Sequence, residues 1–166
     1  MESLVTWFTN NLSQYVSREV VVFIISLMPI LELRGGLLAA SLLKVPMLTA
    51  IPICVTGNII PIPFILLLIK KVFAIMKKWT PTGKFVERIE AHAMKRSGRI
   101  ANAEFLGLML FVGIPLPGTG AWTGSLIASL LDVDIKKAVV AEFIGVVIAC
   151  IIMCIVSYGL LGAIIS

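Results

Sequence analysis

The feature that most constrains the fold of this chain is a run of 23 residues, 47–69, without a single charged side chain. As an α-helix such a run is about 34 Å long, enough to cross the ~30 Å hydrocarbon core of a membrane. Further apolar stretches cover 20–43, 105–131 and 138–165, and 59% of all residues are hydrophobic. A soluble chain of 166 residues cannot bury so much apolar surface, and a disordered chain would be polar and highly charged. We therefore predict an all-α integral membrane protein.

Changes in composition divide residues 1–166, which we interpret as one membrane domain, into four parts. Residues 3–18 have the spacing of an amphipathic helix and are too polar to span, which predicts a helix in the membrane interface. Residues 20–69 and 105–165 are apolar, whereas 70–104 hold nine basic and three acidic side chains. We expect this segment to be a cytoplasmic linker, because basic loops stay on that side. The net charge of +5 thus indicates topology and not a nucleic-acid partner.

The two apolar parts are related by an internal repeat. Shifting the sequence by 88 positions aligns 20–68 with 108–156, with 12 identities in 49 pairs, and five of the six pairs from 38 to 43 are identical. Composition alone does not readily produce such a cluster, so we interpret the chain as a duplication. Each copy is an interrupted apolar segment followed by a long span.

The interrupted segments, 20–43 and 105–131, have two interpretations. Each is a plain transmembrane helix, or each is a re-entrant hairpin whose two arms of about ten residues, roughly 15 Å, reach the membrane centre and return. Hairpins make the two repeats inverted and place 11 basic residues on the linker side, against Arg18 and Lys44 on the other. The positive-inside rule favours this inverted model. Because two hairpins and two spans enclose little space, we also expect a homodimer.

The first hairpin carries the charges that the membrane core disfavours most. Glu32 and Arg34 lie between Pro29 and the pair Gly35–Gly36, near which we expect the second arm to begin. A helix N-terminus suits an anion, and a charge at this depth costs at least ~2.5–3.5 kcal/mol unless it is paired or hydrated. Glu32 and Arg34 are too close in sequence to face each other on a helix, so the pair fits better in a turn or across to the other repeat. The alternative to a binding role is a structural pair that pins the hairpins together.

The second hairpin offers backbone and hydroxyl groups. Its candidate substrate-binding residues are Pro117, Gly118, Thr119, Gly120, Trp122 and Thr123, and its second arm is expected to begin near Gly124. A tight turn at a close-packed helix crossing explains the same residues without a ligand. Glu142, one turn into the last span, is with Glu32 a candidate for proton coupling, or else pairs with Lys137 or Arg34.

Several chemistries are not indicated by the sequence. It has no Walker A pattern, no Ser-His-Asp set and no metal-ligand cluster, so we expect neither an enzyme nor a cofactor or metal. The three cysteines lie in apolar runs and are read as packing residues. Any active transport must then use an ion gradient.

The segment from Pro29 to Gly36 and the segment from Ile114 to Gly124 resemble the small multi-drug export protein family of bacterial and archaeal membranes. That family looks like a compact relative of the DedA / VTT-domain superfamily, in which two facing re-entrant hairpins are described and several members are lipid flippases or scramblases. The resemblance implies a link to recycling of undecaprenyl phosphate and to proton-dependent drug tolerance. This chain departs from the DedA pattern, because Pro117–Gly118 lacks the acid that follows it there.

We therefore predict a multi-pass protein of the inner (cytoplasmic) membrane that contacts membrane lipids. Its expected function is that of a proton-coupled secondary transporter or flippase for an amphipathic anion. We expect this anion to be a polyprenyl phosphate, which suits Arg34 and two helix N-termini. The alternatives are a proton-coupled exporter of cationic drugs and a membrane scaffold without transport.

Overall fold

The computed structural model describes residues 17–78, 83–84, 86–89, 91, 104–116 and 118–160. Within these residues the chain is helical and contains no strand, which confirms the predicted all-α class. The elements are α2 (Arg18–Leu27), α3 (Glu32–Leu42), α4 (Met47–Ile59), α5 (Pro61–Lys77), α7 (Glu104–Gly113), α8 (Ala121–Leu130), α9 (Ile135–Cys154) and the π-helix η1 (Ile155–Leu160). The predicted interfacial helix over 3–18 lies outside the described residues except for its last two. Ser17 caps the N-terminus of α2, and Arg18 is its first residue.

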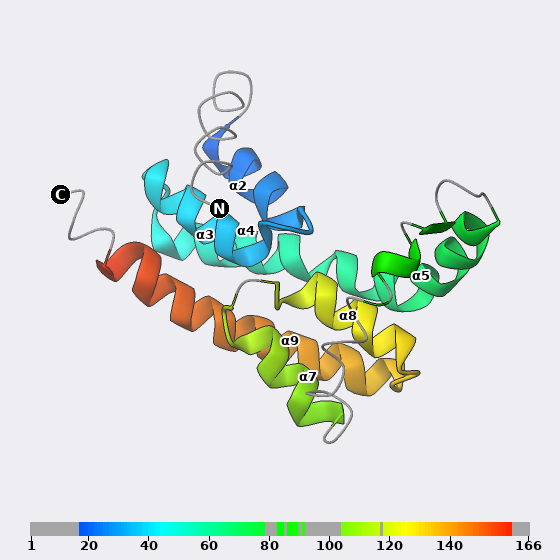
Figure 1. The fold of residues 1–166 in the computed structure, drawn as a ribbon. Coiled ribbons are helices and arrows are strands. Elements are labelled where there is room, and N and C mark those ends of the chain that lie inside the picture. The colour runs from blue at the N-terminus through cyan, green and yellow to red at the C-terminus, as the bar shows by residue number, and fades with distance from the viewer. Residues whose placement is uncertain are drawn as a thin grey trace.

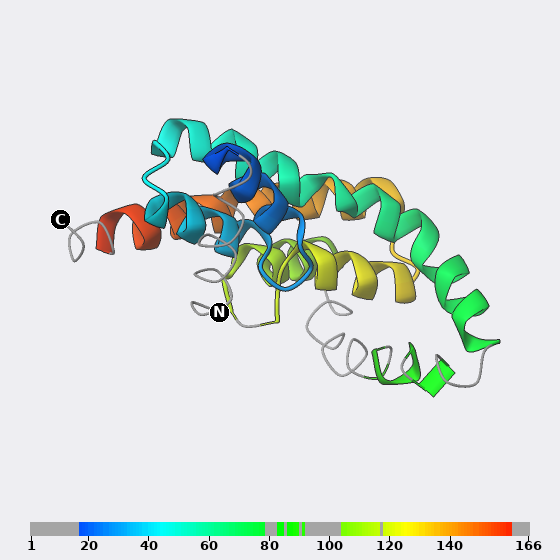
Figure 2. The same cartoon turned by 90° about the horizontal axis from the view of Figure 1, so that it is seen from above.

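Two helical stretches are long and apolar enough to cross a membrane: Met47–Ile75, through α4 and α5, and Ile135–Gly159, through α9 and η1. Figure 1 shows that they run in opposite directions through the molecule, and Figure 2 shows the same from above. The first stretch continues beyond residue 70, at which we expected the basic linker to begin. Helix α5 continues to Lys77, so residues 70–77 belong to the long helix.

The two interrupted segments each form a pair of short helices. Helices α2 and α3 are joined by a turn, and α7 and α8 by a longer loop, as Figure 1 shows. The arms have 10 or 11 residues, roughly 15–17 Å, about half of a bilayer core. Arg18, at the start of α2, donates a hydrogen bond of 3.3 Å to the carbonyl of Leu43, just beyond α3. The first pair therefore returns to the end from which it started.

The predicted starts of the second arms are wrong by a few residues. Helix α3 begins at Glu32 and not near Gly36, and α8 begins at Ala121 and not near Gly124. Both glycines instead lie inside helices, where the missing side chain allows a neighbouring helix to pack closely. A Cβ on Gly36 would lie 1.9 Å from Ser26 Oγ, and one on Gly124 would lie 2.8 Å from a side-chain carbon of Val112.

The turns after α3 and α8 have the same backbone. Each is closed by three hydrogen bonds, and the donors and acceptors of one turn lie 88 residues from those of the other. After α3 the bonds join Leu43 to Ala39, Lys44 to Ser41 and Val45 to Ala40, and after α8 they join Leu131 to Ile127, Asp132 to Ser129 and Val133 to Ala128. Lys44 and Asp132 both adopt a left-handed conformation, with φ of 55° and 57°. The interval found by aligning the sequence with itself thus recurs in the hydrogen bonding.

Glycines also occupy matching contacts on the two long stretches. A Cβ on Gly57 of α4 would lie 2.9 Å from Ser26 Cβ of α2, and a Cβ on Gly145 of α9 would lie 2.7 Å from the Met109 carbonyl oxygen of α7. Each long helix therefore approaches the first arm of its own repeat at a residue without a side chain. This close packing fixes the position of the two helix pairs on the long helices.

Candidate functional site

The Glu32 carboxylate lies at the N-terminus of α8, in the other repeat. The backbone N–H of Trp122 donates to Glu32 Oε1 at 3.1 Å, and the N–H of Ala121 also bonds this carboxylate. Both donors belong to the first turn of α8, where backbone N–H groups have no partner within the helix. The helix N-terminus that we expected to suit an anion thus already holds one, supplied by the chain itself.

Gly120 leaves the space that the Glu32 carboxylate fills. A Cβ at Gly120 would lie 1.8 Å from Glu32 Oε2, and the glycine has a φ of 134°, which side chains rarely tolerate. Glu32 itself has a φ of 50°, a strained value for a residue other than glycine. Positions 32 and 120 are 88 apart, so the same point of each repeat has an unusual backbone where the two helix pairs meet.

Arg34 holds the loop that precedes α8. Its Nη1 donates to the Leu116 carbonyl, and its Nη2 donates to both the carbonyl and the hydroxyl of Thr119, each at 2.8 Å. The Thr119 hydroxyl also bonds the Ile114 carbonyl at 2.9 Å, so this side chain fastens the loop upon itself. Arg34 is 8% exposed and interacts electrostatically with Glu32, whose side chain is 5% exposed. The pair therefore reaches across to the other repeat, the second of the two arrangements expected for it.

Trp122 makes the reciprocal contact. It occupies the position 88 residues after Arg34, and its indole Nε1 donates to the Leu27 carbonyl at the end of α2, at 3.2 Å. Each repeat thus sends a side chain from the first turn of its second arm to a carbonyl after the first arm of the other repeat. These contacts bind the α2–α3 and α7–α8 helix pairs to each other.

Glu142 forms a second buried polar contact nearby. It has no exposed surface, and the Ser125 hydroxyl donates to its Oε2 at 2.6 Å. Its Oε1 has no hydrogen-bond partner among the described residues. The pairing with Lys137 or Arg34 considered from the sequence is not observed: Lys137 is exposed, and the Arg34 guanidinium binds Leu116 and Thr119. Glu142 is close enough to Glu32 for the two carboxyl groups to interact electrostatically.

The other predicted site residues lie in a helix, in the loop before α8 with its first turn, or outside the described residues. Gly35 and Gly36 serve helix packing, since a Cβ on Gly35 would lie 2.6 Å from the Leu31 Cβ. Gly118 lies in the loop with a φ of 77°, and Thr123 is half-buried in the first turn of α8. Pro117 lies outside the described residues. Among the described residues no group of three His, Cys, Asp or Glu side chains is arranged to hold a metal ion.

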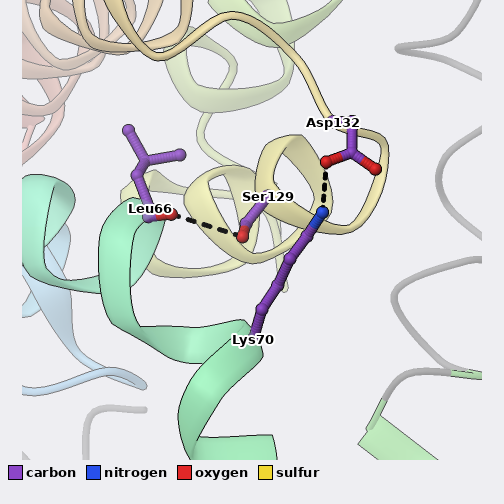
Figure 3. Close-up of polar contacts among 4 residues, drawn as sticks. All are labelled: Leu66, Lys70, Ser129 and Asp132. Atoms are coloured by element: carbon purple, nitrogen blue, oxygen red, sulfur yellow. Dashed lines mark hydrogen bonds and ion pairs between the residues drawn. The ribbon is translucent and has the colours of Figure 1, made fainter. Parts of the chain in front are cut away.

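Sequence reasoning missed three contacts that join α3, α8 and the turn after α8 to the long helices of the other repeat. At one end of the molecule the Ser41 hydroxyl donates to the Ser157 carbonyl at 2.8 Å. At the other the Ser129 hydroxyl, 88 residues later, donates to the Leu66 carbonyl at 3.4 Å, and Lys70 pairs with Asp132 (Figure 3). Each short helix is thus tied to the long helix of the other repeat. No local sequence pattern predicts these contacts, because the two residues of each contact are 62 to 116 positions apart.

The fold and the site together define a class: an all-helical protein with two helices long enough to cross a membrane and a buried cluster of charges between two helix pairs. A family model described as "Putative small multi-drug export protein" matches residues 32–152, and the chain belongs to this family. Neither the curated proteins nor the solved structures yielded a match to the chain.

Proposed function

We propose that the chain is a secondary transporter of the cell membrane, built from two inverted repeats, each a re-entrant hairpin followed by a span. The opposite directions of the two long helices support the inversion, and the short arms and the contact from Arg18 to Leu43 support the hairpins. Inverted repeats with broken helices and a central site are a common plan of secondary transporters. The proposal includes a homodimer, whose second copy completes the substrate path.

The inverted arrangement predicts that Lys44 and Lys136 lie on opposite sides of the membrane. We expect single cysteines at these exposed positions, in a background without Cys54, Cys150 and Cys154, to react with a membrane-impermeant maleimide from opposite sides. Lys136 should react from the side of Arg88 in the basic linker, which is the cytoplasmic side. Four plain spans would place both turns on the same side, so labelling of both from outside would overturn the arrangement.

The substrate that the site supports best is an amphipathic anion, and we propose a polyprenyl phosphate. The observation that carries this proposal is the carboxylate of Glu32 bound at the α8 N-terminus, beside Arg34. Donors that hold a carboxylate are suited to the oxygens of a phosphate. In the proposed cycle a proton from water neutralises Glu32, its carboxyl leaves the α8 N-terminus, and the substrate phosphate takes its place. On the other side Glu32 releases its proton to water, and the ionised carboxylate returns to the α8 N-terminus and displaces the phosphate.

Replacement of Glu32 by glutamine tests this cycle. Purified protein in liposomes should translocate a fluorescent polyprenyl phosphate, and Glu32→Gln is expected to reduce the rate at least about tenfold because the amide takes up no proton. Glu19→Gln, an exposed acid on α2, is the matched control and should retain the rate. Translocation by Glu32→Gln at the control rate, or none by the unchanged protein, would contradict the proposal.

The second candidate is a proton-coupled exporter of cationic compounds. It is favoured by the buried Glu142 carboxyl, whose Oε1 lacks a partner among the described residues, and by the export activity in the family's name. A cation exporter would lose drug efflux on Glu142→Gln while tolerating changes at Arg34. A scaffold without transport is the remaining alternative and would tolerate alanine at both Glu32 and Arg34.

A further inference from the structure

An apolar groove of about 730 Å³ lies between the two long helical stretches. Its walls include Ile51 and Val55 of α4, Ile151 and Cys154 of α9, and Tyr158 of η1. All of these side chains belong to the two stretches long enough to cross a membrane. In water an exposed apolar groove of this kind would promote aggregation. In a bilayer it would be open to the hydrocarbon chains around it.

One end of the groove is marked by polar groups. The Tyr158 hydroxyl donates to the Val45 carbonyl at 2.9 Å, which places this end of the groove at the turn between α3 and α4. The turn carries Lys44, which is exposed and has no ion pair among the described residues. Arg18 also contacts this turn through the Leu43 carbonyl, and the exposed acid Glu19 follows it on α2.

The repeat supplies an internal comparison. A second groove, of about 610 Å³, lies at the other end of the molecule. It shares three repeat-related lining positions with the first groove, among them Lys70, which lies 88 residues before Tyr158. That second groove is lined by the ion pair of Lys70 with Asp132, shown in Figure 3, and by Asp134 and Lys136. Because its cations are matched by acids, it offers little net charge to an anion. Of these two grooves, the first combines apolar walls with a cation at its end, Lys44, that has no ion pair among the described residues.

We propose that the first groove is a lipid-binding site, in which one hydrocarbon chain of an anionic phospholipid lies between α4 and α9 and its phosphate lies at Lys44. The proposal rests on the membrane position given under the proposed function, but it requires no transport. Apolar burial holds the chain, and the charge of Lys44, with Arg18 beside the same turn, selects an anionic headgroup.

Photo-crosslinking of the full chain in nanodiscs tests the site. The probes are phosphatidylglycerol and phosphatidylcholine carrying the same diazirine-labelled chain, in bilayers of unlabelled phosphatidylcholine, and peptide mass spectrometry locates the adducts. We expect phosphatidylglycerol to label 47–55 and 147–159 at least about threefold more than phosphatidylcholine. Lys44→Gln should reduce this preference, with Arg18 as the remaining cation beside the turn. Ile51→Trp, which fills the groove, should remove most adducts there.

Phe64→Trp is the matched control for the added indole, because Phe64 is 60% exposed on α5 and is not part of the groove. It should leave the adducts unchanged. The proposal is overturned if both probes label exposed apolar residues such as Leu67 as strongly as the groove, or if the groove crosslinks to a second copy of the chain. Groove labelling without translocation would refute the flippase and leave the lipid site standing.

Discussion

Alanine at Gly120 is expected to separate the two hairpin tips. The new Cβ would lie 1.8 Å from Glu32 Oε2, on a backbone with a φ of 134°. Strain at such a position costs about 1–3 kcal/mol, and loss of a charged hydrogen bond adds about 1.5–3 kcal/mol. We therefore expect the free energy of unfolding to fall by about 3–5 kcal/mol, measured by denaturation of the protein in mixed micelles.

Gly159→Ala is the matched control for this experiment. A Cβ at Gly159 would meet nothing within 4 Å, so the same chemical change should alter the free energy of unfolding by less than about 0.5 kcal/mol. Equal stability of the Gly120→Ala and Gly159→Ala proteins would show that Glu32 does not occupy the α8 N-terminus.

Replacement of Arg34 by methionine is expected to have a comparable effect. The change removes the donors to Leu116 and Thr119 and leaves Glu32 without its neighbouring cation. Removing one partner from a buried charged network costs about 3–5 kcal/mol, so unfolding in mixed micelles should require correspondingly less denaturant. Arg34→Lys should fall between the two proteins, since an ammonium group cannot reproduce the planar fork.

Arg18→Met provides the comparison, because Arg18 is exposed and, among the described residues, its side chain donates to the Leu43 carbonyl alone. Its substitution should cost less than about 1 kcal/mol. If Arg34→Met is no less stable than Arg18→Met, Arg34 does not fasten the loop before α8, and a purely substrate-directed role would be favoured.

Much of this fold follows from local sequence. The uncharged run 47–69 predicts a long helix, and Pro29 and the Pro115–Gly120 segment predict breaks where the chain turns back. The glycines are harder to interpret. Gly36 reads as a breaker in the sequence and is a packing residue inside α3, because its missing Cβ admits Ser26. Sequence alone does not distinguish these two uses of glycine.

The charged residues of the candidate site could be predicted from the sequence, whereas most of their hydrogen-bond partners could not. Glu32 and Arg34 stand out because so few charges lie in apolar segments, and their contact with the other repeat was one of two arrangements considered. The partner of Glu142 was not foreseen. Ser125 is an ordinary small residue in a helix, and only the packing of α8 on α9 brings its hydroxyl to 2.6 Å from the carboxylate.

The contacts between the hairpin tips also constrain how the protein is made. Glu32 binds Trp122 and Arg34 binds Leu116 and Thr119, so their partners lie 82 to 90 residues further along the chain. At synthesis rates of about 5–20 residues per second, these two charges wait several seconds for the second hairpin to emerge. During that interval the first repeat has an acid and a base without these partners. In the proposed re-entrant arrangement, these unpaired charges would delay the entry of the α2–α3 turn into lipid. Biogenesis of this protein should therefore be completed by the second repeat, and the first repeat made alone should be a substrate for membrane quality control.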